Sequence, residues 1–348
     1  MPGVWFAIPG DLATLTGGYG YARRLMEALP AAGWFPHHLP LPGSFPHPTA
    51  ADLDATAAVL AALPPETPVL VDGLAFGALP GDLLGACDVS FTALVHHPLA
   101  EETGLSASDA ARFQTGERAA LALAQSVVCT SRHTYETLAT TYGVSRGLLF
   151  LAEPGTDPAP RAQSSKNLPQ LLTVATLTHR KAHDVLLDAL GLIKDVPWVI
   201  DLVGSAERDP AVTAKVRALI AQHGLGGRVI LRGALKDEEL NAAYASADVF
   251  VLPSRHEGYG MVFAEALAHG LPIVACAAGA VTDTVPREAG ILVQPDDPAA
   301  LAEALRRVLT DARLRRNLSD HAWDYGQRLP TWSDTAAQVS EALWASLP

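Results

Sequence analysis

The chain has 348 residues, of which 49% are hydrophobic, and a formal net charge of −12. This length exceeds the size at which one hydrophobic core usually stops growing, so two domains are expected. No lysine precedes Lys166, and binding to nucleic acid or to anionic lipid depends on clustered Lys and Arg, so the sequence argues against a nucleic-acid partner and against a polybasic membrane patch.

The first half of the chain alternates short apolar runs with helical patterns. Strands are expected at 4–8, 68–73, 90–95, 126–130 and 148–152, and helices at 20–33, 51–63, 111–124 and 131–143. The apolar, proline-rich stretch 35–48 is interpreted as a loop. Strands that alternate with helices predict a parallel, doubly wound sheet, and ligands of such sheets bind beyond the carboxyl ends of the strands.

A stretch rich in Pro, Ser and Gln at 153–170 then interrupts the pattern and is the expected interdomain linker. The alternation resumes with strands expected at 171–176, 198–204, 228–233, 247–254, 272–277 and 290–294. The predicted fold class is therefore α/β, with two Rossmann-like doubly wound domains that face a central cleft. Such a cleft is a preferred place for a small-molecule site.

The cysteines and the N-terminus indicate the compartment. The three cysteines are widely spaced and lie among apolar residues, which is typical of core thiols under reducing conditions and not of disulfides or metal ligands. The opening "MPGVWFAIPG" has no positive region and is interpreted as a first strand and not as a signal peptide. No run approaches the roughly 20 apolar residues of a membrane helix. We expect a cytoplasmic protein.

The stretch "EGYGMVFAE" places Glu257 and Glu265 on either side of a strand-to-helix turn. It follows the strand expected at 247–254 and opens a helix that ends at Gly270. Gly258 and Gly260 lie in the turn, where backbone N–H groups and the positive end of the helix dipole favour anionic groups and sugar hydroxyls.

Glu265 lies one turn into that helix, among apolar residues. A carboxylate in this setting needs hydrogen-bond donors, and a vicinal diol such as that of a ribose offers two hydroxyls. The alternative is an exposed Glu265 that pairs with His269 at i+4. Spacing alone does not decide between these two interpretations.

The segment "SRHEGYGMVFAEALAHGLPIVA" resembles the signature of glycosyltransferase family 4, the retaining GT-B enzymes that use nucleotide sugars. Further matches follow in the family's order: "TGGYGYARRL", "LVHHP", "VVCTSRHT", "EPGTD", "HRKAHDVLLDAL", "GAVTDTV" and a tryptophan-bearing C-terminal helix. The resemblance implies an N-terminal acceptor-side domain at 1–157, a C-terminal donor domain at 158–330, and a helix at 331–348 that returns to the first domain.

The resemblance also implies roles for residues of the second domain. Glu265 would bind the nucleotide ribose, and Glu257 would contact the donor sugar. Lys181 would neutralise the donor diphosphate, where a fixed cation is a large electrostatic term. The backbone from Gly258 through Tyr259 and Gly260 to Met261 would hold sugar hydroxyls and phosphate oxygens.

The sequence departs from the family pattern at one diphosphate cation. Family members usually carry Gly-Arg where Ala175 and Thr176 stand. Either Arg180 replaces this arginine or the Thr176 hydroxyl suffices, and the resemblance leaves both open.

In the first domain the resemblance implies roles for two glycines and one histidine. Gly17 and Gly18 match the glycine turn that lets the first helix approach the diphosphate and the acceptor. His96 occupies the position of the family's active-site histidine, near the reacting sugar. Adjacent His97 makes this assignment ambiguous by one residue, and a structural histidine that closes a strand is the alternative.

Two acidic motifs are interpreted as the starts of helices and not as metal-binding sites. Asp52-Leu53-Asp54 has the Asp-x-Asp form that binds metal in the other glycosyltransferase fold, but it opens the helix expected at 51–63. The "PDDP" motif at 295–298 indicates a turn into a helix. The twelve histidines show no metal-ligand spacing. We therefore expect no metal site and no cofactor, with the nucleotide sugar as substrate.

Three functions fit the sequence. The favoured one is a metal-independent, retaining hexosyltransferase that uses a nucleoside-diphosphate sugar, with UDP-sugar the first expectation and GDP- or ADP-sugar the rivals. Its acceptor would be a hydroxyl on a glycan, a lipid or a small metabolite, and a lipid acceptor would bring peripheral contact with a membrane. The alternatives are a nucleotide-sugar 2-epimerase of the same fold and a non-catalytic nucleotide-sugar binder.

Overall fold

The computed structural model describes residues 1–163 and 168–348, and the chain divides into two compact units. Unit 1 comprises Met1–Gly155 and Pro330–Pro348, and unit 2 comprises Thr156–Leu329. The sequence placed these boundaries after residues 157 and 330. The expected linker at 153–170 has neither helix nor strand over 153–163, and its residues 164–167 lie outside the described residues.

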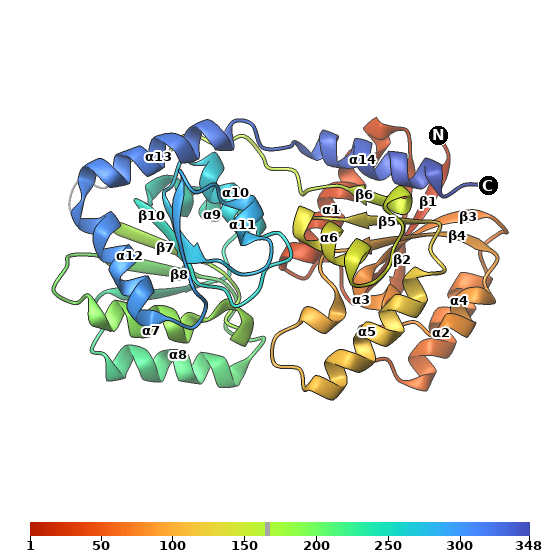
Figure 1. The fold of residues 1–348 in the computed structure, drawn as a ribbon, viewed down its shortest axis with the longest axis horizontal. Helices are drawn as coiled ribbons and strands as arrows, with labels where there is room; N and C mark the ends of the chain where they lie inside the picture. The colour runs from red at the N-terminus through yellow and green to blue at the C-terminus, as the bar shows by residue number, and fades with distance from the viewer. Residues whose placement is uncertain (164–167) are drawn as a thin grey trace. The chain divides into compact units, whose positions relative to one another are not determined.

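Unit 1 contains a parallel six-stranded sheet in the order β2-β1-β3-β4-β5-β6 (Figure 1). The strands are β1 Gly3–Pro9, β2 Phe35–Leu41, β3 Thr67–Asp72, β4 Val89–Val95, β5 Ser126–Cys129 and β6 Leu149–Leu151. Every residue of β4 is buried, because helices cover both faces of the sheet. The strand order reverses between β1 and β3, which is where doubly wound sheets bind their ligands.

Strand β2 corrects the interpretation of 35–48 as a loop. Its sequence "FPHHLPL" contains Pro36 and Pro40, and a proline has no N–H to donate to a ladder. The strand lies at the edge of the sheet and pairs only with β1, so an edge position tolerates both prolines. Proline content alone was therefore a misleading signal.

The helices of unit 1 include the C-terminal one. They are α1 Gly17–Ala28, η1 Leu29–Ala32, α2 Ala50–Ala61, α3 Gly73–Phe76, α4 Gly81–Gly85, η2 Leu99–Glu101, α5 Ala107–Leu121, α6 Arg132–Thr140, η3 Arg146–Leu148 and α14 Trp332–Ala345. Helix α14 lies against α1 and η1 (Figure 1), where Trp34 donates to the Ser340 hydroxyl over 3.1 Å. The expected return of the last helix to the first domain is confirmed.

The helix-start interpretation of Asp52 is also confirmed. Thr49 and Asp52 form a capping box at the start of α2: the Thr49 hydroxyl accepts from the Asp52 N–H, and Asp52 accepts from the Thr49 N–H. The hydrogen bonds from Thr49, together with one from Ser44, hold the pKa of Asp52 below its ordinary value. This carboxylate therefore stabilises a helix end.

Unit 2 contains a second parallel six-stranded sheet in the order β12-β11-β10-β7-β8-β9 (Figure 1). The strands are β7 Gln170–Val174, β8 Val199–Val203, β9 Val229–Gly233, β10 Val249–Leu252, β11 Ile273–Cys276 and β12 Gly290–Val293. The order reverses between β7 and β10, so these neighbours begin the two halves of a Rossmann arrangement. Ligands of this arrangement bind beyond the carboxyl ends of β7 and β10.

Helices cover both faces of the second sheet. They are η4 His179–Lys181, α7 His183–Leu192, α8 Pro210–Gln222, α9 Asp237–Ser246, α10 Met261–Ala268, α11 Val281–Thr284, α12 Pro298–Thr310 and α13 Ala312–Gly326. The N-cap Asp297 accepts from the Ala300 N–H, which confirms the turn into a helix expected at "PDDP". Alternate residues of β10 point to opposite faces of the sheet. Val249 and Val251 belong to one hydrophobic core, and Phe250 and Leu252 belong to the other.

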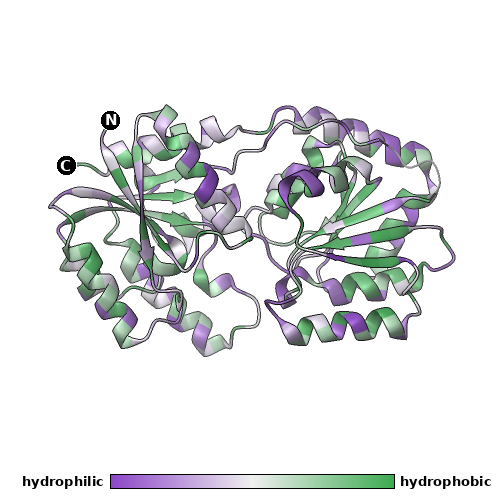
Figure 2. Cartoon of the chain, turned by 180° about the vertical axis from the view of Figure 1, so that it is seen from behind, coloured by the Kyte–Doolittle hydropathy of each residue, from purple (hydrophilic) through white to green (hydrophobic). Residues whose placement is uncertain are grey.

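Figure 2 shows that the hydrophobic colour follows the strands within each unit, as expected for sheets that are covered on both faces. Cys129 and Cys276 are buried free thiols and Cys87 is half-buried, which fits the interpretation of the cysteines as core residues. Across residues 1–163 and 168–348, no helix is long and apolar enough to cross a membrane.

Candidate functional site

The turn after β7 presents two cations at the carboxyl edge of the second sheet. The 3-10 helix η4 carries Arg180 and Lys181 and is followed by Ala182, which adopts a left-handed conformation with φ of 52°. Helix α7 begins at the next residue, His183. The helix expected after Arg180 and Lys181 is therefore present, and both cations precede its first residue.

The segment after β10 lies at the same edge, because β7 and β10 are neighbours in the sheet. It contains Glu257 and reaches α10 through Gly260, whose φ is 88°. A Cβ at Gly260 would lie 2.6 Å from the Phe263 ring, so both the backbone conformation and the packing require glycine there. The N-cap of α10 is Gly260, and within the described residues no side-chain hydrogen bond caps the N-terminus of this helix.

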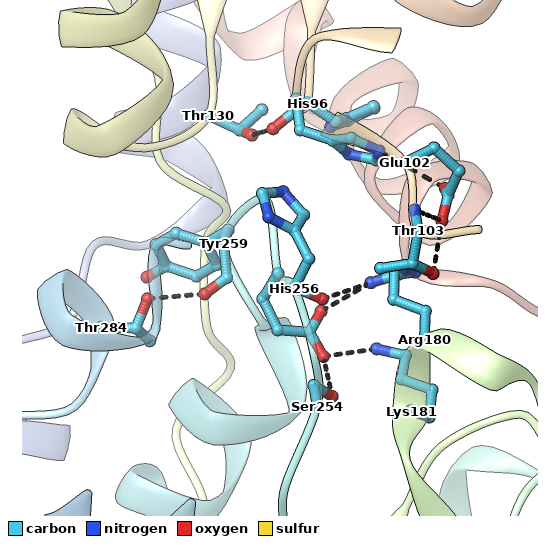
Figure 3. A network of polar contacts seen from close by, with 12 residues as sticks. His96, Glu102, Thr103, Thr130, Arg180, Lys181, Ser254, His256, Tyr259 and Thr284 are labelled. Atoms are coloured by element: carbon cyan, nitrogen blue, oxygen red, sulfur yellow. Dashed lines mark hydrogen bonds and ion pairs between the residues drawn. The ribbon is translucent and has the colours of Figure 1, made fainter. Parts of the chain in front are cut away.

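Glu257 joins the two segments. Its Oε1 accepts from Lys181 Nζ and from Ser254 Oγ, each over 2.6 Å, and its Oε2 accepts from Arg180 Nη1 over 3.1 Å. Figure 3 labels the three donors Arg180, Lys181 and Ser254. Arg180 Nη1 also donates to the carbonyl of His256 over 2.9 Å. Two cations and one carboxylate that are distant in the sequence therefore form one cluster.

The Glu257 carboxylate stays charged although its side chain is only 5% exposed. Burial raises the pKa of a carboxyl group, but the charges of Lys181 and Arg180, with hydrogen bonds from Lys181 and Ser254, outweigh it and lower this pKa to about 2. The sequence assigned Lys181 and Arg180 to the diphosphate and Glu257 to the sugar. It did not indicate that they contact one another, nor that Ser254 joins them.

Residues 279–285, which the sequence analysis identified only as a match to the family, support the backbone around Tyr259. Thr284 Oγ1 donates to the Tyr259 carbonyl over 2.6 Å (Figure 3), and the Ala280 N–H donates to the Glu257 carbonyl over 2.9 Å. A Cβ at Gly279 would lie 2.4 Å from that same carbonyl oxygen. Gly258 and Tyr259 are buried and Met261 is half-buried, so this turn is held in place.

Glu265 lies one turn into α10 and is half-buried. Its Oε2 accepts from the Tyr244 hydroxyl over 2.7 Å, and burial raises its pKa against the lowering effect of this bond. The ring of His269 stacks on Tyr244, and its Nδ1 lies 3.0 Å from the Pro160 carbonyl. The partner observed for the Glu265 carboxylate is therefore Tyr244, which the sequence reasoning missed, and the alternative of an exposed Glu265 is wrong.

In unit 1, Gly17 and Gly18 follow β1 and His96 follows β4, two parallel strands that are separated in the sheet by β3. Helix α1 begins at Gly17, and a Cβ at Gly18 would lie 3.7 Å from the His96 ring, an ordinary van der Waals distance, so Gly18 and His96 are close neighbours. The Tyr21 ring meets His96 edge-on at 5.1 Å between centroids. Both glycines and His96 therefore gather at one place on the first sheet.

His96 is a neutral imidazole at pH 7. Burial, aided by the charge of His97, lowers its pKa to about 4. Its carbonyl accepts from the hydroxyls of Thr130 (Figure 3) and Thr134, and its Nε2 lies 3.8 Å from Asp72 Oδ2. Burial also raises the pKa of Asp72 to about 6, against the Leu74 N–H bond and the charge of His97.

His97 points to different partners, with its Nε2 3.6 Å from Glu102 Oε2. The two adjacent histidines therefore have distinct surroundings, and His96 is the one beside Gly18. This geometry favours His96 over His97 as the histidine of the expected site.

Comparison with known proteins identifies the second unit. Residues 168–311 match the model of the family "Glycosyl transferases group 1". The chain is a homologue of the group 1 glycosyltransferases. The resemblance to glycosyltransferase family 4 is confirmed to this extent. The two parallel six-stranded sheets with their helices form the GT-B fold, which solved glycosyltransferase structures share.

The relatives agree with this assignment. D-inositol 3-phosphate glycosyltransferase of Xylanimonas cellulosilytica is 29% identical over 242 residues, which cover 64% of this chain and 58% of that protein. The protein of the same name from Streptomyces avermitilis is 30% identical, with 67% and 54% covered. The matched part thus spans little more than half the length of these relatives.

Two solved structures share the fold over almost the whole chain. Sucrose-phosphate synthase from Thermosynechococcus elongatus has a TM-score of 0.83 at 24% identity, and 98% of each chain is covered. Anabaena HepE in complex with UDP-glucose has a TM-score of 0.75 at 17% identity, with 98% and 99% covered. The cluster of Arg180, Lys181 and Glu257 and also Glu265 lie inside the region matched by the family model.

Proposed function

We propose that the chain is a retaining glycosyltransferase that moves a hexosyl group from a nucleoside-diphosphate sugar, with a UDP-sugar the favoured donor, to a hydroxyl acceptor. The observation that carries this proposal is the ion cluster at the carboxyl ends of β7 and β10. Lys181 and Arg180 follow the first of these strands and Glu257 follows the second. Rossmann sheets bind nucleotides at this point of reversal.

The two cations fit a diphosphate. Their side chains are 15% and 24% exposed, so their charges are only partly screened by water while they remain open to a ligand. Charge develops on the leaving nucleoside diphosphate as the bond to the sugar breaks. Lys181 and Arg180 would stabilise that charge in a fixed geometry and without reorganisation.

Arg180 is our candidate for the cation that the family pattern expects at position 176. Thr176 is half-buried and carries no charge, whereas Arg180 shares the Glu257 carboxylate with Lys181. The two cations bind different oxygens of one carboxylate, which places them side by side. This arrangement supplies the paired positive charge that a diphosphate needs.

Glu257 would orient the cations and contact the donor sugar. A carboxylate offers about four lone-pair positions, and three donors, Lys181, Ser254 and Arg180, are already bound to Glu257. One position on Oε2 would accept a sugar hydroxyl. The backbone from Gly258 to Met261 would bind further hydroxyls and phosphate oxygens at the start of α10.

Glu265 would bind the ribose. Tyr244 donates to one oxygen of its carboxylate and thereby fixes the rotamer. A ribose diol would donate to the carboxylate by charge-assisted bonds and offset the cost of burying it.

His96 would act on the reacting sugar as a neutral imidazole. The acceptor oxygen would bond to the anomeric carbon while the bond from that carbon to the diphosphate breaks, and the hydroxyl proton would pass to the departing phosphate oxygen. No covalent intermediate on the enzyme is needed. A neutral His96 would hold a sugar hydroxyl without adding a charge.

We further propose that the reaction needs no metal, because Arg180 and Lys181 supply the positive charge that a divalent cation would bring to the diphosphate. Activity that survives EDTA is the expected result. A glycan, a lipid or a small metabolite is the proposed acceptor and the cytoplasm the proposed compartment. The names of the proteins compared above mention D-inositol 3-phosphate and sucrose phosphate, and neither compound is assigned to this chain.

A thermal-shift screen with UDP, GDP and ADP tests the donor site. A ligand at 100 times its dissociation constant stabilises the folded protein by about 2.7 kcal/mol, so one nucleotide should raise the melting temperature clearly. We expect UDP to do so. Three unchanged melting temperatures would contradict the proposal.

A further inference from the structure

Arg255 contacts the turn that carries Arg180 and Lys181, the cations proposed to bind the diphosphate. This turn, residues 179–182, is called the cation turn below. Its Nη1 donates to the His179 carbonyl over 2.5 Å, and its Nη2 lies 3.1 Å from Asp184 Oδ2. Its Nε donates to Asp296 over 2.8 Å, and its backbone N–H donates to the Arg180 carbonyl over 2.8 Å. One residue therefore contacts the cation turn, the start of α7 and the turn before α12.

The cation turn has little stability of its own. Helix η4 has only three residues, and the Thr178 side chain does not cap it. Ala182 closes it with φ of 52°, a left-handed conformation that is strained for a residue other than glycine. Two of the carbonyls in this turn, those of His179 and Arg180, accept hydrogen bonds from Arg255. The turn is therefore held from outside.

The guanidinium is suited to this task because its donors spread over a rigid plane. Nε, Nη1 and Nη2 reach three different segments of the chain, and the side chain is only 14% exposed. A lysine carries the same charge on a single nitrogen and cannot reach all three partners at once. The contacts thus depend on the shape of Arg255 as well as on its charge.

Asp184 completes the link between Arg255 and α7. It lies in the first turn of the helix and also binds the exposed Lys215, with 2.8 Å between Oδ2 and Nζ. Burial acts to raise its pKa, but the bonds and charges of Lys215 and Arg255 lower it to about 2. Asp184 is therefore ionised throughout the neutral range and remains a partner for Arg255.

We propose that Arg255 is a positioning residue that holds Arg180 and Lys181 in the geometry required to bind the diphosphate of the donor. It stands two residues before Glu257 and binds the turn before α7, so it sets the distance between the carboxylate and both cations. This inference rests on the proposed donor site. It adds a residue that acts through Arg180 and Lys181.

Calorimetry on the full chain tests the proposal with ligands that differ only in the diphosphate. UDP, GDP and ADP are titrated into the wild-type protein, and the nucleotide that binds is compared with its nucleoside. In Arg255→Met the affinity for the diphosphate should fall at least about tenfold, while the affinity for the nucleoside changes less than twofold. Arg255→Lys should recover little of the loss.

Lys215→Met is the matched control, because it removes the other cation bound to Asp184 and leaves Arg255 in place. It should bind the diphosphate as the wild type does. If Arg255→Met unfolds, Asp296→Asn replaces it, because it weakens one contact at a side chain that is 58% exposed. It should show a smaller loss that is again confined to the diphosphate.

The outcomes separate this inference from the proposed function. A wild-type protein that binds none of the three nucleotides would contradict the proposed function itself. Wild-type binding with unchanged diphosphate affinity in both Arg255 variants would overturn only the positioning role. An equal loss for nucleoside and diphosphate would also overturn it, because it would show a general loss of structure.

Discussion

Lys181 Nζ lies 2.6 Å from Glu257 Oε1, and the two residues are 76 positions apart in the chain. Their side chains are 15% and 5% exposed, so the pair is largely removed from water. Removal of one partner from a buried pair leaves the other charge without compensation. Lys181, which is proposed to bind the diphosphate of the donor, therefore also contributes to the stability of the protein without ligand.

Lys181→Ala should lower turnover of the diphosphate donor far more than it lowers affinity for the nucleoside. Removal of one fixed group that stabilises the charge developing on the leaving group typically lowers the rate by about 10² to 10³. Lys194→Ala removes an exposed lysine on the same unit and should leave turnover unchanged. Equal losses for donor turnover and nucleoside binding would indicate misfolding instead.

Arg180→Ala should produce the same pattern if Arg180 supplies the second cation. The guanidinium binds Glu257 Oε2, so the variant also loosens the carboxylate. Steady-state rates with the preferred donor measure the effect. Normal turnover in this variant would mean that Thr176 or backbone groups suffice.

Glu265→Gln should weaken binding of the free nucleoside diphosphate. Charge-assisted hydrogen bonds contribute about 1.5–3 kcal/mol, which corresponds to a loss of roughly tenfold or more in affinity. Tyr244→Phe keeps the carboxylate but removes the hydroxyl that orients it, so a smaller loss is expected. Calorimetry that gives the wild-type dissociation constant for Glu265→Gln would remove the ribose role.

His96→Ala should lower the turnover number by roughly 10² or more and leave nucleotide affinity nearly unchanged, because His96 lies in unit 1 and the nucleotide residues lie in unit 2. His97→Ala is the control for the neighbouring ring. The pKa of about 4 also predicts that no histidine titration near pH 6.5 arises from His96 in the rate profile. A large loss in His97→Ala with normal His96→Ala would move the role by one residue.

Glu117→Gln should alter the pH dependence of stability. The Glu117 side chain is buried and accepts from the Leu99 N–H, and burial raises its pKa to about 7 from an ordinary value of 4.5. A raised pKa favours folding below pH 4.5, and this contribution is lost as the pH rises through 7. The variant should therefore gain stability relative to the wild type at pH 8 and not at pH 4. Melting temperatures are measured for both proteins at both pH values. The same difference between variant and wild type at pH 4 and at pH 8 would contradict the raised pKa of Glu117.

The repeating strands and helices were predictable because buried parallel strands are continuous apolar runs, as β4 and β10 show. Strand β2 was missed because its prolines suggest a loop unless the edge position is known. Short helices such as α3 and α4 leave too few residues for a period to be recognised.

The candidate site was predictable only as separate residues. The motif around Glu257 indicated its position in a turn, but its bonds to Arg180 and Lys181 depend on the order of β7 and β10 in the sheet. The same holds for Tyr244, which lies 21 positions before Glu265 and contacts it through the packing of α9 and α10. Arg255 gave no signal because its partners come from three other segments.

The most direct test of the proposed transferase is to incubate the protein with UDP-, GDP- and ADP-hexoses and to measure the released nucleoside diphosphate together with the remaining donor. We predict that one donor, first a UDP-hexose, is consumed by transfer or slow hydrolysis, and that Lys181→Ala lowers the rate of release by about 10² or more. Conversion of the donor into its epimer would show an isomerase. A donor that binds and is recovered unchanged, in the presence of glycan, lipid and small-molecule acceptors, would show a binding protein and would contradict the proposed activity.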